Sequence, residues 1–202
     1  MRPTFIIAAA AGFAALSILS GPAWALVSLA SRTFVSGHGS DSNPCTLAAP
    51  CRSFAQALTQ TSAGGEIAVL DTAGYGTVTI NKSVSIVSQG GVEAGVTTAS
   101  AIDAITVSIG ASDVVNLRGL TLVGGGVGTN GINFGGLGML NIQDCAIRGF
   151  GNGIAFAPSG TAALNVSDTS VSNITQEGIG IVPPRCRNGD GSLQSGPSDR
   201  CR

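Results

Sequence analysis

The sequence predicts an all-β fold: a single-stranded right-handed parallel β-helix, a solenoid of about 25 residues per coil with a short N-terminal capping helix. Composition and internal repetition are the observations behind this prediction. Glycine accounts for 30 of the 202 residues, 44% of the residues are hydrophobic and 10% are charged. Such a chain is too apolar to be intrinsically disordered, and its glycines lack the proline period of collagen. Its length suits one domain.

Two interleaved series of short apolar segments repeat along residues 103–182. The first series has an asparagine between two aliphatic residues at intervals of 25 and 24 residues: Val115-Asn116-Leu117, Leu140-Asn141-Ile142 and Leu164-Asn165-Val166. The second series has isoleucines at intervals of 27, 22 and 25 residues: Ile105, Ile132, Ile154 and Ile179. A propeller blade needs roughly 40 residues, so the shorter period favours the coil of a parallel β-helix.

Equivalent residues of successive coils stack about 4.8 Å apart in such a solenoid. We therefore expect Asn116, Asn141 and Asn165 to form a ladder in which each side-chain amide binds the next. The isoleucines of the second series are expected to form a matching aliphatic stack inside the solenoid.

The N-terminus has the features of a signal peptide, which we assign to residues 1–25. Arg2 precedes an apolar run from Phe5 to Leu19, and Gly21-Pro22 separates this run from the cleavage site Ala23-Trp24-Ala25. The alternative is an uncleaved membrane anchor, but the run is shorter than the roughly 20 residues that span a bilayer. The sequence thus predicts a secreted protein (extracellular, periplasmic or at the cell surface) with no membrane span after cleavage.

Residues 26–64 form the predicted N-terminal cap. Glycine and Asx residues between Arg32 and Pro50 are typical of turns. Ser53 followed by Gln56 has the spacing of a capping box, which predicts a helix of barely two turns that ends at Gly64-Gly65.

The predicted solenoid follows the cap and covers residues 65–182. It begins with three short strands rich in β-branched residues, expected over 67–70, 78–80 and 84–87. A polar tail that contains cysteine and arginine, residues 183–202, ends the chain.

Export implies an oxidising compartment, in which the five cysteines are candidates for disulfide bonds. Cys45 and Cys51 lie close together in the cap, and Cys186 and Cys201 both lie in the tail. The economical assignment is two local disulfides, with Cys145 unpaired. No metal site is predicted, because the sequence has no C-x-x-C motif and a single histidine.

The cap contains Thr33-Phe34-Val35-Ser36-Gly37, turn residues up to Asn43-Pro44, and Pro50-Cys51-Arg52-Ser53-Phe54 before the expected helix. With the repeats that follow, this pattern resembles the secreted right-handed parallel β-helix proteins of the pectate-lyase-like superfamily over residues 32–182. The resemblance implies export and an extracellular polysaccharide as partner. That superfamily includes polysaccharide lyases, glycoside hydrolases and surface proteins.

Lyases of this superfamily hold a calcium ion with acidic side chains and remove a proton with an arginine or lysine. The candidates in this sequence are Asp144 and Asp168, which take the same place in successive coils, with Arg148 nearby. Stacked carboxylates about 5 Å apart suit calcium, or the carboxylate pair of a retaining glycosidase. However, Gly119 takes the equivalent place one coil earlier. We favour the alternative that both aspartates are turn residues that accept backbone N–H groups.

These observations predict a secreted β-helix repeat protein that is non-catalytic, has a structural, carbohydrate-binding or surface-binding role, and needs no cofactor. The alternative is a calcium-dependent polysaccharide lyase or a glycoside hydrolase that acts on an acidic polysaccharide. Nucleic acid is not an expected partner, because residues 26–182 carry five basic and nine acidic side chains.

The end of the repeat leaves three explanations open. Pro183-Pro184 cannot continue a strand ladder, and no cap for the last coil is visible in the sequence. The tail folds back under a Cys186–Cys201 disulfide, the last coil pairs end to end with a second subunit, or the reading frame is truncated or shifted near Pro183. The change in composition favours the third explanation.

Overall fold

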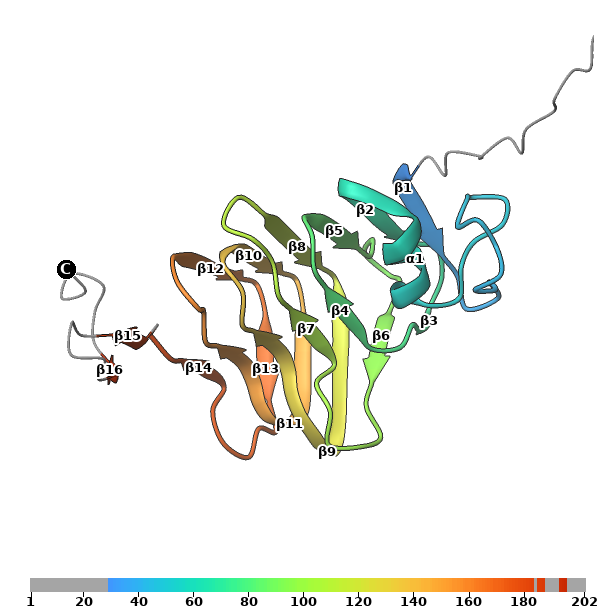
Figure 1. The fold of residues 1–202 in the computed structure, drawn as a ribbon. Helices are drawn as coiled ribbons and strands as arrows, with labels where there is room; N and C mark the ends of the chain where they lie inside the picture. Colours follow the sequence, from blue (N-terminus) through green and yellow to red (C-terminus); the bar gives the residue numbers. More distant parts are fainter. Residues whose placement is uncertain (1–28, 184, 188–192, 196–202) are drawn as a thin grey trace, which may run out of the picture.

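The computed structural model describes residues 29–183, 185–187 and 193–195. Here the chain forms a parallel β-solenoid of about four turns, with about 25 residues per turn and one short helix (Figure 1). The predicted fold class is confirmed. The predicted signal peptide lies outside the described residues. No helix in the described part of the chain is long and apolar enough to cross a membrane.

Six parallel strands, whose order in space follows their order in sequence, form one sheet, which we call the first face. Its strands are β1 (Ala30–Val35), β2 (Thr61–Val69), β5 (Val84–Val87), β8 (Val114–Arg118), β10 (Gly138–Gln143) and β12 (Ala162–Ser167). Val115 pairs with Leu140, and Leu140 pairs with Leu164. Equivalent residues of the first repeat series therefore pair with each other across the strands of this face.

A sheet of eight strands forms the rest of each coil. Its strands are β3 (Ala73–Gly74), β4 (Val78–Ile80), β6 (Ala94–Thr97), β7 (Ile105–Val107), β9 (Leu120–Phe134), β11 (Ala146–Phe156), β13 (Ser170–Ser172) and β14 (Ile179–Ile181). The first parts of β9 and β11 pair with β6 and β13, and we call this region the second face. Their last parts pair with β7 and β14, and with β4 these form the third face.

The isoleucines of the second repeat series stack in register along the third face. Ile105 pairs with Ile132, Ile132 with Ile154, and Ile154 with Ile179. The first three are fully buried, because alternate residues of a strand point to opposite sides of its sheet. The aliphatic stack that the sequence predicts is therefore present for these three residues, whereas Ile179, in the last coil, is exposed.

The helix α1 (Phe54–Gln60) lies at the N-terminal end of the solenoid (Figure 1). Ser53 is its N-cap and accepts a hydrogen bond from the Gln56 N–H at 3.2 Å, as the capping-box spacing predicts. The expected end at Gly64-Gly65 is wrong, because the helix stops before Thr61. Thr61 has an extended backbone, and its hydroxyl donates to the Ala57 carbonyl at 2.7 Å, so the chain enters β2 directly.

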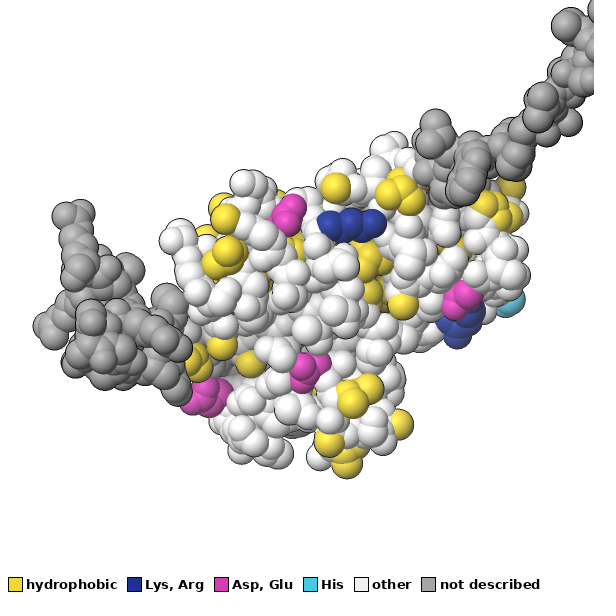
Figure 2. Space-filling model, viewed as in Figure 1, with side chains coloured by type: hydrophobic (Ala, Val, Ile, Leu, Met, Phe, Trp, Pro, Cys, Tyr) yellow, Lys and Arg dark blue, Asp and Glu magenta, His cyan; other side chains and the backbone are white. Residues whose placement is uncertain are grey.

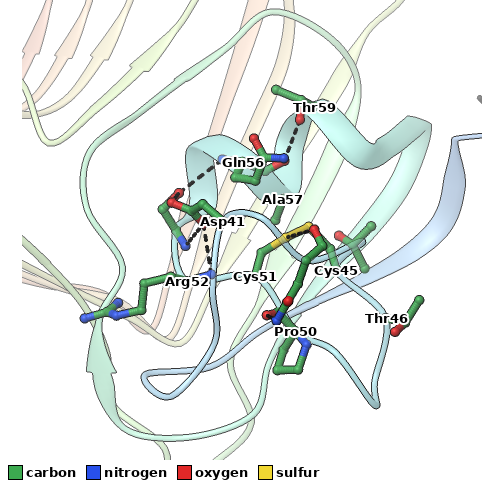
Figure 3. The surroundings of a disulfide bond; sticks show 12 residues. Asp41, Cys45, Thr46, Pro50, Cys51, Arg52, Gln56, Ala57 and Thr59 are labelled. Atoms are coloured by element: carbon green, nitrogen blue, oxygen red, sulfur yellow. Dashed lines mark hydrogen bonds between the residues drawn. A yellow bond between two sulfur atoms is a disulfide. The ribbon is translucent and has the colours of Figure 1, made fainter.

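The predicted Cys45–Cys51 disulfide is present in the cap loop (Figure 3). Asp41 in the same loop accepts hydrogen bonds from the backbone N–H groups of Arg52 and Ser53, each at 2.9 Å, and so ties the loop to the start of α1. Cys145 is a free, buried thiol, and desolvation raises its pKa. The expected Cys186–Cys201 disulfide lies outside the residues whose side chains the structure describes.

The carboxylate of Asp71 joins the cap to the first coil. It accepts hydrogen bonds at 2.6 Å from the Ser36 hydroxyl, the Gly37 N–H and the Tyr75 hydroxyl, and His38 Nδ1 lies 3.3 Å away. Desolvation raises the pKa of Asp71, but these hydrogen bonds outweigh it and leave the pKa well below its ordinary value. Because Ser36 donates to Asp71 and not to His38, these residues do not form a Ser-His-Asp triad.

At the opposite end of the solenoid, no further strand of the described residues pairs with the last coil. The last coil consists of β12, β13 and β14, and it exposes apolar side chains, among them Ile179 and Ile181. In the tail, β15 (Arg185–Arg187) and β16 (Leu193–Ser195) form an antiparallel pair.

We predict that Asp71→Asn lowers the free energy of unfolding at pH 7 by about 1–3 kcal/mol, because buried donors lose a charged acceptor. The folded-state pKa of Asp71 lies below its unfolded value, so the stabilisation is present above about pH 4 and is lost as the pH falls below it. Urea unfolding at pH 7 and at pH 2.5 measures both effects.

The control for this prediction is Glu93→Gln, which removes an exposed carboxylate outside this hydrogen-bond network. This variant should unfold like the wild-type protein at both pH values. A destabilisation by Asp71→Asn that is as large at pH 2.5 as at pH 7 would contradict the assigned role.

Candidate functional site

The two candidate aspartates lie at one corner of the solenoid, directly after strands β10 and β12 of the first face. Their backbone φ angles are positive, 52° at Asp144 and 48° at Asp168, and Gly119 has a φ of 70° at the same corner one coil earlier. Glycine and aspartate are among the residues that adopt this left-handed conformation most readily. The corner geometry therefore accounts for the residue types at all three positions.

Asp144 has Arg118 as its partner, with Arg118 Nε 3.3 Å from Asp144 Oδ2. Arg148 is exposed on β11, and Asp168 is exposed at its corner. Among the described residues, no hydrogen bond or ion pair joins the side chains of Arg148 or Asp168 to another group. Nor does that part of the chain contain a cluster of three or more His, Cys, Asp or Glu side chains. The catalytic role of the three candidates stays a prediction.

A cavity of about 610 Å³ lies beside Asp144. Two ion pairs line this cavity, Arg118–Asp144 and Arg32–Glu66, and the N–O distance in the second pair is 2.9 Å. The charges within each pair balance, and all four side chains are more than one-third exposed to solvent. Exposed ion pairs of this kind contribute only about 0–1 kcal/mol to the stability of the folded protein.

The asparagines of the first repeat series lie on the outer side of the first face. Asn165 Nδ2 donates to Asn141 Oδ1, and Asn141 Nδ2 donates to Asn116 Oδ1, both at 2.8 Å. Asn116 Nδ2 then donates to the Ser85 hydroxyl at 3.0 Å. Each step joins one coil to the one before it, so this ladder connects the coils of the first face.

A second ladder lies at the start of the third face. Asn152 Nδ2 donates to Asn130 Oδ1 at 2.9 Å, and Asn130 Nδ2 donates to Asp103 Oδ1 at 2.7 Å. Asn133 Nδ2 donates to the other carboxylate oxygen of Asp103, also at 2.7 Å. Sequence analysis missed this set. Its signal was present, since Asp103, Asn130 and Asn152 each stand two residues before an isoleucine of the second series.

Asp103 borders an open groove of about 970 Å³ on the third face. One wall comes from α1, the other from the loop before β7, and the outer sides of β4, β7 and β9 form the floor. Threonines and asparagines supply most of its polar groups: Thr59, Thr77, Thr79, Thr106, Asn130 and Asn133. Figure 2 shows one side of the molecule, where charged side chains are few and scattered.

The floor of the groove is a column of outward-pointing polar side chains. Thr79 pairs with Thr106, and Thr106 pairs with Asn133, so three hydroxyl or amide groups follow one another from coil to coil. Leu58 and Ile102 line the walls with apolar groups, and none of the described residues that line the groove is aromatic. The arrangement offers hydrogen bonds and small apolar contacts to a ligand, and its volume is typical of ligand sites.

No protein-family model, no curated protein and no solved structure matches the chain. The structure shows a parallel β-solenoid of about four turns, and the resemblance to the pectate-lyase-like superfamily stays a prediction. The candidate site is therefore defined by its geometry.

Proposed function

We propose that this protein is a secreted β-solenoid that binds an extended polysaccharide in the groove on the third face and does not cleave it. The observation that carries the proposal is the threonine and asparagine floor across β4, β7 and β9. Successive strands are about 4.8 Å apart, so the floor offers a regular series of hydrogen-bonding groups. Sugar hydroxyls both donate and accept, which suits a lining of hydroxyls and amides.

Two features support export. The first 25 residues have the order of charged, apolar and small residues that is typical of a signal peptide. The Cys45–Cys51 disulfide connects the cap loop to Cys51, which pairs with Val35 of β1. Disulfide bonds persist in oxidising compartments.

We predict that Thr106→Arg weakens binding to the preferred polysaccharide by about tenfold or more, because a long side chain then occupies the floor of the groove. Affinity electrophoresis in gels that contain dextran, galactomannan, xylan or polygalacturonate measures the retardation.

Gln143→Arg is the matched control, since it adds the same side chain at an exposed position on the first face. It should leave the retardation unchanged. Equal retardation of wild type and Thr106→Arg would place the binding surface elsewhere, and no retardation by any polymer would refute the proposed function.

The alternative activity, cleavage of an acidic polysaccharide at Asp144, Asp168 and Arg148, makes a different prediction. We expect folded wild-type protein to release no product from polygalacturonate with or without calcium, because Asp144 is engaged by Arg118. Release of reducing or unsaturated ends would contradict this expectation. If the release were lost in Asp144→Ala and in Asp168→Ala, the enzyme would be established.

End-to-end self-association stays a prediction, with a second copy of this chain as the partner. Residues of the cap and α1 cover the N-terminal end, whereas the last coil exposes apolar side chains and has no further strand paired to it within the described part of the chain. Two last coils therefore suit each other in a closed dimer.

We expect light scattering to give twice the chain mass, and Ile181→Asp to give a monomer. Leu47→Asp, at an exposed apolar position in the cap, should stay dimeric. A monomeric wild type would refute the prediction.

A further inference from the structure

We infer that the groove on the third face selects a neutral glycan, with the Asp103 carboxylate as the fixed acceptor for sugar hydroxyls. This inference rests on the proposed function and adds the ligand class and the residue that determines it.

Hydrogen bonds from two asparagines hold the Asp103 carboxylate in one orientation. Asn130 donates to Oδ1 and Asn133 donates to Oδ2, each at 2.7 Å. A carboxylate oxygen accepts up to two hydrogen bonds, so each oxygen keeps capacity for a further donor. Asp103 is half-buried and borders the groove. Two adjacent hydroxyls of a sugar ring can donate to such a carboxylate without first reorienting it.

The ladder behind Asp103 explains why a carboxylate stands there. Asn152 donates to Asn130, and Asn130, which is 8% exposed, donates to Asp103. Every amide in this series donates toward the N-terminal end of the solenoid, so its last member has to be an acceptor. A carboxylate is the strongest acceptor among the side chains and accepts shorter hydrogen bonds than a neutral group.

Backbone hydrogen bonds fix the loop that carries Asp103. The Ala104 N–H donates to the Asn130 carbonyl at 3.0 Å, and the Thr129 N–H donates to the Ile102 carbonyl at 3.1 Å. Both bonds join the loop to β9, on either side of Asp103. The acceptor is thus held in place before a ligand binds, which lowers the entropy cost of binding.

The charges that line the groove favour an uncharged ligand. Asp103 has no cationic partner among the described residues. Lys82 is the cationic residue of the lining, and its ammonium donates to the Thr61 carbonyl at 2.6 Å. A uronate or sulfate group would therefore meet an unpaired carboxylate and a lysine that is already engaged. A hydroxyl donor would gain a charge-assisted hydrogen bond.

Isothermal titration of the purified full chain with neutral polymers (dextran, galactomannan and xylan) and with polygalacturonate tests the inference. We expect a neutral polymer to bind and polygalacturonate to bind at least about tenfold more weakly. Binding of the neutral polymer should change little when NaCl is raised, because its hydroxyls carry no net charge.

The variant that tests the residue is Asp103→Asn, which should weaken neutral-polymer binding by about tenfold or more. Glu93→Gln removes the same charge at an exposed position outside the groove and should bind like the wild type. The comparison of polymers with wild-type protein remains decisive even if Asp103→Asn does not fold.

Three results would overturn the inference. Tighter binding of polygalacturonate would mean that the groove or another surface selects acids, and neutral-polymer binding unaffected by Asp103→Asn would mean that another group is the acceptor. Both leave the proposed function standing. No binding of any polymer would refute the proposed function together with this inference.

Discussion

Backbone hydrogen bonding between each coil and the next is the constraint on which the remaining structure depends. A parallel strand pairs in register only if the chain returns to the same place after each turn, so loop lengths vary while the strands stay aligned. Ile105, Ile132 and Ile154 are separated by unequal stretches of chain and still pair directly. Alternation within a strand then buries one side of each rung and exposes the other. Core and surface are therefore both columns of equivalent residues.

Columns of this kind give the two asparagine ladders different roles. The ladder on the first face ends at the Ser85 hydroxyl, within the same sheet. The ladder on the third face ends at the Asp103 carboxylate, where the loop before β7 and α1 rise on either side of the sheet. Similar stacking chemistry thus connects coils in one place and orients a carboxylate at the border of a groove in another. The side chain at which each ladder ends, and its position relative to the groove, determine whether the ladder can take part in ligand binding.

The two ends of the solenoid differ in how far the described residues cover the terminal coil. At the N-terminal end, α1, the Cys45–Cys51 loop and the hydrogen bonds of Asp71 cover and fix the first coil. At the other end, the last coil exposes apolar side chains, among them Ile181, and no strand among the residues that the structure describes pairs with it from outside. A solenoid is stabilised by contacts between neighbouring coils, so its terminal coils have half as many neighbours as the others.

The sequence by itself determined the coil period, the pairing of the isoleucines, the N-cap at Ser53 and the Cys45–Cys51 disulfide. These features depend on residues that are close in sequence or that recur about once per coil, so the order of residues along the chain reports them directly. Only the tertiary structure decided that Asp144 lies beside Arg118 and that residues from α1 to β9 enclose a groove at Asp103. Loops and corners do not follow the strand period, so their position in space, and with it the candidate site, becomes visible only when the coils are stacked.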